Sequence, residues 1–450
     1  SATTTTAPAT GWLPSNYYTP CATTCISVST VTPSTLLASW PFENNANDVS
    51  GNANHGQIMN GAIFTTGYIG QAIQLLNDSA QYVAASYMDF TNRSFTVEAW
   101  VYPYLLQDTD APIFTECEVK TIDKCLHYLL REQNIYLAFY NDDIRGTTQL
   151  TSYTWYHVAF VYDYANNIKT AYLNGIIDAT SSASAATASK SAYLGTNGEI
   201  RIGAWEYYSY AWDGLIDQVI VSNRVKTYCE ILNDATLVAH FAFDGTYNDI
   251  GPNSMKETHT SQSNSGVALV TGRVNQAINF NLSNSYSQSC EYYSLGQNQP
   301  YSIAMWVNPS FPGGTLFHLS SDATGSGAWC LPMIGFNSNG SIVGQTWNGS
   351  RAISLVGPIL PINNWTHVVL TYSSTNGLQL YINGGLYSSA PIDRFAASNR
   401  IMCVTLANSL LGTNCQTGSI SMGAFQGAID EFYVYNRELN DAEVCPLAHP

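Results

Sequence analysis

The feature that most constrains the fold is an internal duplication of the chain. Five segments of residues 40–224 recur in the same order within 241–437, such as WYHVAFVYDYANNIKTAYLNG (155–175) and WTHVVLTYSSTNGLQLYING (365–384). The offset between matching segments drifts only from about 201 to 213 residues. Ordered self-similarity marks repeated structural units, and 450 residues exceed what one core usually supports. We therefore predict repeats at 36–232 and 233–450, preceded by a Thr/Ser/Pro-rich arm at 1–35.

The segments within each repeat have the pattern of β-strands. FTVEAWV (95–101) and LIDQVIVSN (215–223) are rich in apolar, aromatic and β-branched residues, and NG, DG and NN turns separate such runs. Helical periodicity is confined to two short stretches, at 225–232 and 439–447. Many evenly spaced strands predict an all-β fold, with an antiparallel two-sheet sandwich in each repeat.

The composition argues against nucleic acid and anionic membranes as partners. The chain carries 32 Asp and Glu against 16 Lys and Arg, for a net charge of −16. It therefore lacks the cationic field that would neutralise phosphates, whereas metal cations or neutral glycans suit this charge. No apolar run approaches the roughly 18 residues that a membrane span requires.

The cysteines and glycosylation sequons favour a secreted, disulfide-bonded glycoprotein whose signal peptide has been removed. The chain has ten cysteines and six Asn-x-Ser/Thr sequons, at Asn77, Asn92, Asn281, Asn339, Asn348 and Asn364. Short loops predict the disulfides Cys117–Cys125 and Cys403–Cys415. Cys330 then pairs elsewhere, with Cys290 as one option. The remaining cysteines tie the arm to the domain ends or to another chain: Cys21, Cys25, Cys229 and Cys445.

Several of the repeated motifs carry a family resemblance. They are D-x-S-G-N-x-x-H-G (48–56), W-x-H-V (155–158 and 365–368), Y-[LI]-N-G (172–175 and 381–384) and a G-x-I-D-[EQ]…N-R ending in each repeat. Together they resemble the laminin-G-like jelly rolls of the concanavalin A-like lectin/glucanase superfamily, over about 400 of the 450 residues. The resemblance implies the fold in tandem. It leaves the function open among lectins, adhesion modules, structural proteins and glycosidases.

Acidic residues at matching positions of the two repeats suggest a calcium site. The resemblance implies that, in members that bind calcium, the first and last strands share the ion. Carried over to this chain, it predicts the ligand sets Glu43, Asp48 and Asp217, and Asp244, Asp249 and Asp430. The alternative is that the loop residues form turns, while the two strand aspartates accept backbone N–H groups.

An aromatic cluster at 204–212 is a candidate glycan platform. It comprises Trp205, Tyr207, Tyr208, Tyr210 and Trp212, and repeat two shortens the segment to GAFQG (423–427). The same rings equally suit packing on a neighbouring repeat or subunit. A retaining glycosidase needs two carboxylates about 5–5.5 Å apart, and the family's spaced acidic pattern is absent, with Glu116 and Glu118 as the nearest pair. The recurring His157 and His367 lie between apolar residues and are expected to be core histidines.

We therefore predict a secreted, non-enzymatic glycoprotein with a structural or adhesive role through protein–protein contacts. Self-assembly into an extracellular filament or oligomer through the arm is a further expectation, because an arm with so few core residues needs a surface to lie against. The alternative is a calcium-dependent lectin that uses the 204–212 aromatics. A glycoside hydrolase is the third reading.

Overall fold

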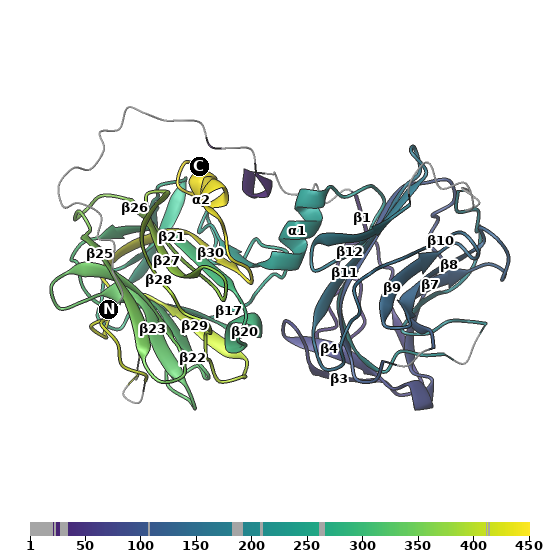
Figure 1. Cartoon of the computed structure of the whole chain (residues 1–450), viewed down its shortest axis with the longest axis horizontal. Helices are drawn as coiled ribbons and strands as arrows, with labels where there is room; N and C mark the ends of the chain where they lie inside the picture. The colour runs from purple at the N-terminus through teal and green to yellow at the C-terminus, as the bar shows by residue number, and fades with distance from the viewer. Residues whose placement is uncertain are drawn as a thin grey trace. The chain divides into compact units, whose positions relative to one another are not determined.

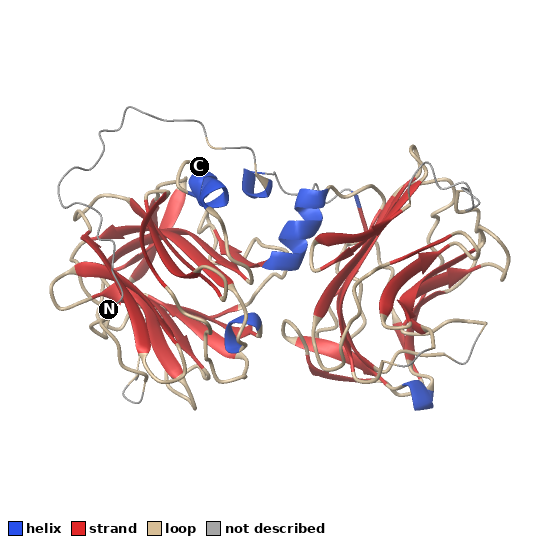
Figure 2. Cartoon of the chain, in the orientation of Figure 1, coloured by secondary structure: helices blue, strands red, loops and turns tan. Residues whose placement is uncertain are grey.

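The computed structural model divides the chain into two compact units. It describes residues 21, 24–27, 35–106, 109–181, 192–207, 210–260, 266–410, 412 and 415–450. One unit is Ser29–Ala235, the first domain, and the other is Thr236–Pro450 with Ser1–Val28, the second domain. The division falls after residue 235, three residues beyond the expected join after 232. Both domains are built almost entirely of strands (Figures 1 and 2).

The first domain consists of two antiparallel sheets. Its eight-stranded sheet runs in the order β13 (Ile176–Thr180), β12 (Ile168–Leu173), β11 (Tyr156–Asp163), β6 (Phe95–Pro103), β15 (Gly214–Ser222), β4 (Gln71–Leu75) and β3 (Ile63–Thr66), with β1 (Leu36–Trp40) paired to β15. Its seven-stranded sheet runs in the order β10 (Asp143–Arg145), β9 (Asn134–Ala138), β8 (Cys125–Arg131), β7 (Ala111–Cys117), β14 (Ile200–Ile202), β5 (Tyr82–Ala85) and β2 (Gln57–Met59).

The second domain repeats this topology strand for strand. Its eight-stranded sheet runs in the order β28 (Gly385–Ala390), β27 (Gly377–Ile382), β26 (Thr366–Ser373), β21 (Tyr301–Pro309), β30 (Gly427–Tyr435), β19 (Gln276–Phe280) and β18 (Val267–Thr271), with β16 (Leu237–Phe241) paired to β30. Its seven-stranded sheet runs in the order β25 (Ala352–Ile359), β24 (Ser341–Trp347), β23 (Cys330–Phe336), β22 (Thr315–Ser320), β29 (Met402–Leu406), β20 (Ser287–Tyr292) and β17 (Glu257–Thr260). The prediction of two tandem domains, each an antiparallel two-sheet sandwich, is confirmed.

In each domain the two sheets face each other across an apolar core. Phe95, Phe114 and Phe160 of the first domain are fully buried there, as are Ile303, Phe317 and Leu370 of the second. Each such side chain contributes about 1.5–3 kcal/mol by leaving water. Because side chains alternate along a strand, the residues between these core positions point outward, where a binding site has to be sought.

A short helix follows the last long strand of each domain. In α1 (Tyr228–Thr236), Ile231 packs on Val161 and Tyr172 at the outer side of the eight-stranded sheet. In α2 (Asp441–Leu447), Val444 packs on the matching face of the second domain. Both helices start with a capping box, in which a glutamate at the third helical position bonds back to the preceding N-cap residue.

The described residues of the N-terminal arm between Cys21 and Ser27 belong to the second domain. Cys21 is disulfide-bonded to Cys445, and Ile26 packs against the apolar cluster beneath α2. Residues Cys25–Ser27 form a 3₁₀ turn. Residues 1–20, 22–23 and 28–34 of the arm lie outside the described residues. Self-association through the arm therefore stays a prediction.

The disulfides agree with the predictions in one case and differ in another. Cys117 bonds Cys125, as the short loop predicted. Cys403 bonds Cys290, and Cys415 bonds Cys330, so the predicted bond Cys403–Cys415 and the option Cys290–Cys330 are wrong. The reason is topological. Cys290 and Cys403 lie on the adjacent strands β20 and β29, with Cα atoms 3.9 Å apart but 113 residues apart in sequence.

No helix among the described residues is long and apolar enough to cross a bilayer.

Candidate functional site

The acidic residues predicted to bind calcium act as backbone anchors in the first domain. Asp48 accepts hydrogen bonds from the backbone N–H groups of Ser39, Ser50 and Asn54 at 2.8–2.9 Å. Burial alone would raise its pKa, but these bonds hold the pKa of Asp48 below its usual value. Asp217 accepts from two N–H groups of the 67–71 turn, and Glu43 accepts from a third. Burial raises the pKa of Asp217 well above its usual value.

The second domain repeats these anchors. Asp249 accepts from the N–H groups of His240, Gly251 and Met255 at 2.7–2.8 Å. Asp430 and Asp244 hold the turn at 272–276 in the same way. Burial raises the pKa of Asp430 to about 7. The six carboxylates thus stabilise four loops, as the alternative reading of the sequence expected.

This arrangement does not fit a shared metal ion. Among the described residues, neither predicted set brings three ligand atoms within 4.8 Å of one another. Calcium prefers six to eight converging oxygens, whereas oxygens of all six carboxylates already accept N–H groups. Calcium stays a prediction that these contacts do not support.

The aromatic cluster at 204–212 is only partly available to a ligand. Trp212 is completely buried in the core. Trp205 is 4% exposed, with its indole N–H directed at the sulfurs of Cys117 and Cys125 and its ring stacked on His127 at 4.7 Å. Tyr207 is exposed, and its hydroxyl donates to the Glu118 carbonyl. Tyr208 lies outside the described residues. The cluster is therefore not the open platform that the sequence suggested.

Two residues of the cluster line a pocket on the outer face of the seven-stranded sheet. This pocket, which we call the outer-face pocket, has a volume of about 230 Å³ and is lined by Asp110, His127, Arg131, Tyr136, Tyr140, Asn141, Trp205 and Tyr210. The sequence reasoning missed six of these residues, from Asp110 to Asn141. A signal in the sequence could have found them. Side chains alternate along CLHYLLR (125–131), which places a His and an Arg on the outward face of a buried strand.

The outer-face pocket presents fixed polar groups between aromatic rings. Arg131 makes two hydrogen bonds to Asp110, at 2.6 and 2.7 Å, and its guanidinium lies 4.0 Å from the centre of the Tyr136 ring. Its Nη1 atom makes no hydrogen bond within the described part of the chain. His127 Nδ1 lies 3.2 Å from the Cys125 carbonyl oxygen. Burial lowers the pKa of His127 to about 4, so the ring is neutral and Nε2 is an acceptor.

The corresponding face of the second domain is closed. Residues 407–426 connect β29 to β30, against 203–213 in the first domain, and we call this longer connection the strap. The expectation that repeat two shortens the segment was wrong, because the sequence match covered only its end. The strap bonds to β23 and β24 through the N–H groups of Gln416, Ser419 and Ser421, at 2.8–2.9 Å. It therefore covers the face that stays open in the first domain.

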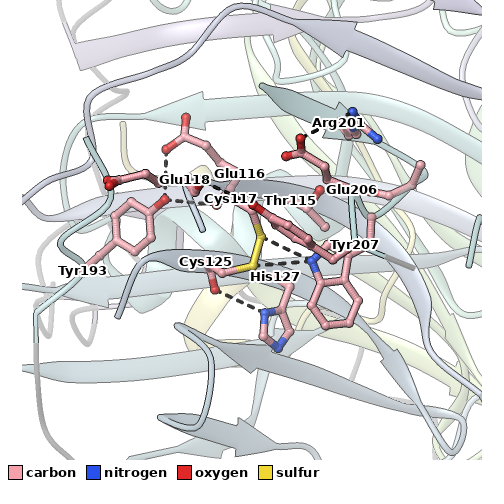
Figure 3. The surroundings of a disulfide bond; sticks show 12 residues. Thr115, Glu116, Cys117, Glu118, Cys125, His127, Tyr193, Arg201, Glu206 and Tyr207 are labelled. Atoms are coloured by element: carbon pink, nitrogen blue, oxygen red, sulfur yellow. Dashed lines mark hydrogen bonds and ion pairs between the residues drawn. A yellow bond between two sulfur atoms is a disulfide. The ribbon is translucent and has the colours of Figure 1, made fainter. Parts of the chain in front are cut away.

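The nearest carboxylate pair does not resemble a glycosidase centre. Glu116 points inward, where it accepts the Met88 N–H. Its carboxylate contacts the Tyr193 hydroxyl (Figure 3). Glu118 is bound by Lys124 and Thr196. His157 and His367 are buried, and burial lowers the pKa of each to about 3, as expected of neutral core histidines.

The sequon asparagines lie at or near the surface. Asn92, Asn281, Asn339 and Asn364 are exposed, whereas Asn77 and Asn348 are half-buried. The Asn77 side-chain oxygen also accepts the Ala211 N–H at 3.0 Å. Exposed amides suit glycan attachment better than amides engaged in the fold, and glycosylation stays a prediction at all six sequons.

Comparison with known proteins concerns the fold. Domain 4 of the GH43 extracellular arabinanase AbnA from Geobacillus stearothermophilus, in complex with arabinotriose, has 19% identity and a TM-score of 0.37, over 44% of this chain and 97% of that one. Domains LG4-5 of the mouse laminin alpha1 chain have 10% identity and a TM-score of 0.27, over 92% and 93%. The binding domain of botulinum neurotoxin serotype D has 9% identity and a TM-score of 0.38, over 84% and 98%. No curated protein matches the sequence.

A family profile settles the classification of both domains. The laminin-G-type profile described as "Concanavalin A-like lectin/glucanases superfamily" matches residues 77–232 and 281–445, which is more than half of the chain. Each match lies within one of the two jelly rolls described above. The disulfides and the laminin-G-like domains are typical of extracellular proteins. The chain belongs to the concanavalin A-like lectin/glucanase superfamily.

Proposed function

We propose that the chain is a non-enzymatic extracellular protein that binds a neutral carbohydrate in the outer-face pocket of its first domain. The observation that carries the proposal is the difference between the two domains at this face. The strap closes the face in the second domain, whereas the first domain leaves a cavity walled by tyrosine rings. The predicted structural or adhesive role concerns protein–protein contacts of the sandwich surfaces, and the predicted self-assembly concerns the arm. Both remain separate from this proposal.

The groups in the pocket suit a sugar with several hydroxyls. Arg131 Nη1 is a donor and His127 Nε2 an acceptor, and Asn141 adds an exposed amide at the rim. Tyr140 offers a ring against which the C–H groups of a sugar can pack, whereas the Tyr136 ring is buried beneath the Arg131 guanidinium. A neutral ligand is favoured because Asp110 already neutralises Arg131, and the chain carries a net charge of −16.

Glycan-array binding and calorimetry with the full chain test this proposal. Arg131→Met keeps the aliphatic stem over Tyr136 but removes the donors, so we expect at least a tenfold loss of affinity. Arg351→Met is the matched control, because Arg351 is an exposed arginine of the second domain. Equal binding by the two variants and the wild type would contradict the pocket. Release of reducing ends from the bound sugar would contradict the non-enzymatic part.

A further inference from the structure

A second aromatic surface lies on the opposite sheet of the first domain. Two tyrosines there pack on Trp100 and Trp155 on the outer face of the eight-stranded sheet, and two more pack beside them. We call these four residues the tyrosine shelf: Tyr68, Tyr102, Tyr104 and Tyr153. The Tyr68 ring stacks on the Trp100 ring with their centroids 3.5 Å apart, and the centroids of the Tyr102 and Trp155 rings lie 5.2 Å apart. Tyr104 and Tyr153 stack on each other at 6.0 Å with an interplanar angle of 25°.

The described part of the second domain has no such shelf, although it keeps both tryptophans as Trp306 and Trp365. Backbone pairing identifies the matching positions. Tyr102 matches Asn308, because each is paired with the residue after the first glycine of the last long strand, Leu215 and Ala428 respectively. Tyr153 matches Asn363, because the N–H group of each bonds the carbonyl of the proline that ends the neighbouring strand, Pro103 and Pro309 respectively. By the same reasoning Tyr68 and Tyr104 correspond to Arg273 and Ser310. Four tyrosines have thus been added to, or retained on, one copy of a shared framework.

Tyr153 shows that folding alone does not account for the shelf. Its φ is +60°, a left-handed conformation that bulky side chains disfavour and asparagine tolerates. The second domain places Asn363, with φ +53°, in the same turn. Tyr153 is nevertheless 66% exposed, so its ring gains little from burial. A strained and exposed aromatic residue is best explained by a contact with a ligand.

Hydrogen-bonding groups lie beside the exposed ring. The Gln74 amide N–H donates to the Tyr104 hydroxyl at 3.1 Å. This bond leaves the Tyr104 O–H as a donor and the Gln74 side-chain oxygen as an acceptor. The described residues place no Lys or Arg over the shelf rings, whereas Arg273 lies 4.7 Å above Trp306 in the second domain.

We propose that the tyrosine shelf is a second, independent binding site for a neutral saccharide. One sugar ring stacks on the outer face of Tyr153, because its C–H groups are attracted to the negative face of the aromatic ring. Its hydroxyls bond Tyr104 and Gln74. A protein partner is less well suited, since a stable interface buries about 800 Å² per side, and Tyr68 is only 4% exposed while Tyr102 and Tyr104 are half-buried.

The experiment uses the full chain and an array of neutral oligosaccharides of defined linkage, with calorimetry on each hit. Tyr153→Asn installs the residue that the second domain uses, so the variant is expected to fold. It should lose at least tenfold in affinity for the shelf ligand. Arg131→Met tests the outer-face pocket and should leave the Tyr153-dependent binding intact. The two sites, and the failure of either proposal, are therefore distinguishable.

Three results would overturn the shelf proposal. The first is binding of every oligosaccharide by Tyr153→Asn with wild-type affinity. The second is a wild-type protein that binds none of the array while its melting curve shows it to be folded. The third is a change of oligomeric state in Tyr153→Asn, measured by light scattering, without a change in saccharide binding, since this would make the shelf a protein contact.

Discussion

The two domains share one fold but bury different chemistry under the helix that follows the last strand. In the first domain, Lys226 is 5% exposed and its ammonium group contacts Glu98 and, at 2.7 Å, Asp234. The matching positions of the second domain are apolar, and the cluster there contains Ala304, Leu439 and Leu447. Two carboxylates on its ammonium group raise the pKa of Lys226, which therefore stays protonated.

The comparison shows that the fold does not require these charges. Thr96 accepts the Lys226 N–H in the first domain, and Ser302 accepts the Leu439 N–H in the second, so the backbone course is the same. An ion cluster of this kind is costly to desolvate and costly to break, yet replacing all of it with apolar residues is often neutral or stabilising. The second domain is a natural example of that replacement.

The largest effect is expected from breaking the ion cluster one residue at a time. Lys226→Leu leaves the buried carboxylate of Glu98 and the half-buried carboxylate of Asp234 without a counter-charge and should destabilise the first domain by about 3–5 kcal/mol. The triple variant Glu98→Ala, Lys226→Leu, Asp234→Leu copies the second domain and should recover most of that loss. Urea unfolding of the full chain measures both. A triple variant as unstable as the single one would show that the first domain depends on its charges.

A second buried carboxyl group also distinguishes the two domains, and it makes the stability of the first domain depend on pH. Glu116 faces the core where the second domain has Leu319. Burial raises the pKa of Glu116 to about 8. The Tyr193 hydroxyl donates to the Glu116 backbone carbonyl at 3.0 Å and lies 3.2 Å from its carboxyl group. The hydroxyl oxygen can therefore accept the proton of a neutral Glu116.

The sign of the resulting pH dependence follows from the raised pKa. The folded state binds the proton more tightly than the unfolded chain, whose glutamate pKa is about 4.3. The stabilising contribution is therefore complete below about pH 4.3 and is lost as the pH rises toward 8. Glu116→Gln removes this dependence. As the pH rises across this window, the variant's free energy of unfolding should therefore increase relative to that of the wild type, by about 1.4 kcal/mol per pH unit. Urea unfolding at pH 5, 6, 7 and 8 measures the difference, and a constant difference would contradict it.

The duplication made the fold predictable, because motifs such as W-x-H-V recur only if both copies build the same strands. The site was less predictable. Cys290 and Cys403 become neighbours only through strand order, which spacing does not reveal. The outer-face pocket depends on the length of a connection that carries little repeated sequence. Trp205 and Trp212 look alike in the sequence, yet one lies against a disulfide and the other in the core.

The smallest effect is expected for calcium, and it tests whether the acidic loops of the two domains differ. A bound ion at a hundred times its Kd adds about 2.7 kcal/mol to the folded state, which raises Tm by roughly 5–10 °C for a domain of this size. Asp48 and Asp249 each accept three backbone N–H groups without an ion. We therefore expect calorimetric transitions in millimolar calcium and in EGTA that coincide within the scan error. A calcium-dependent rise of one transition alone would show that one domain rearranges its anchors into a metal site, and would identify which repeat retained the calcium ligands.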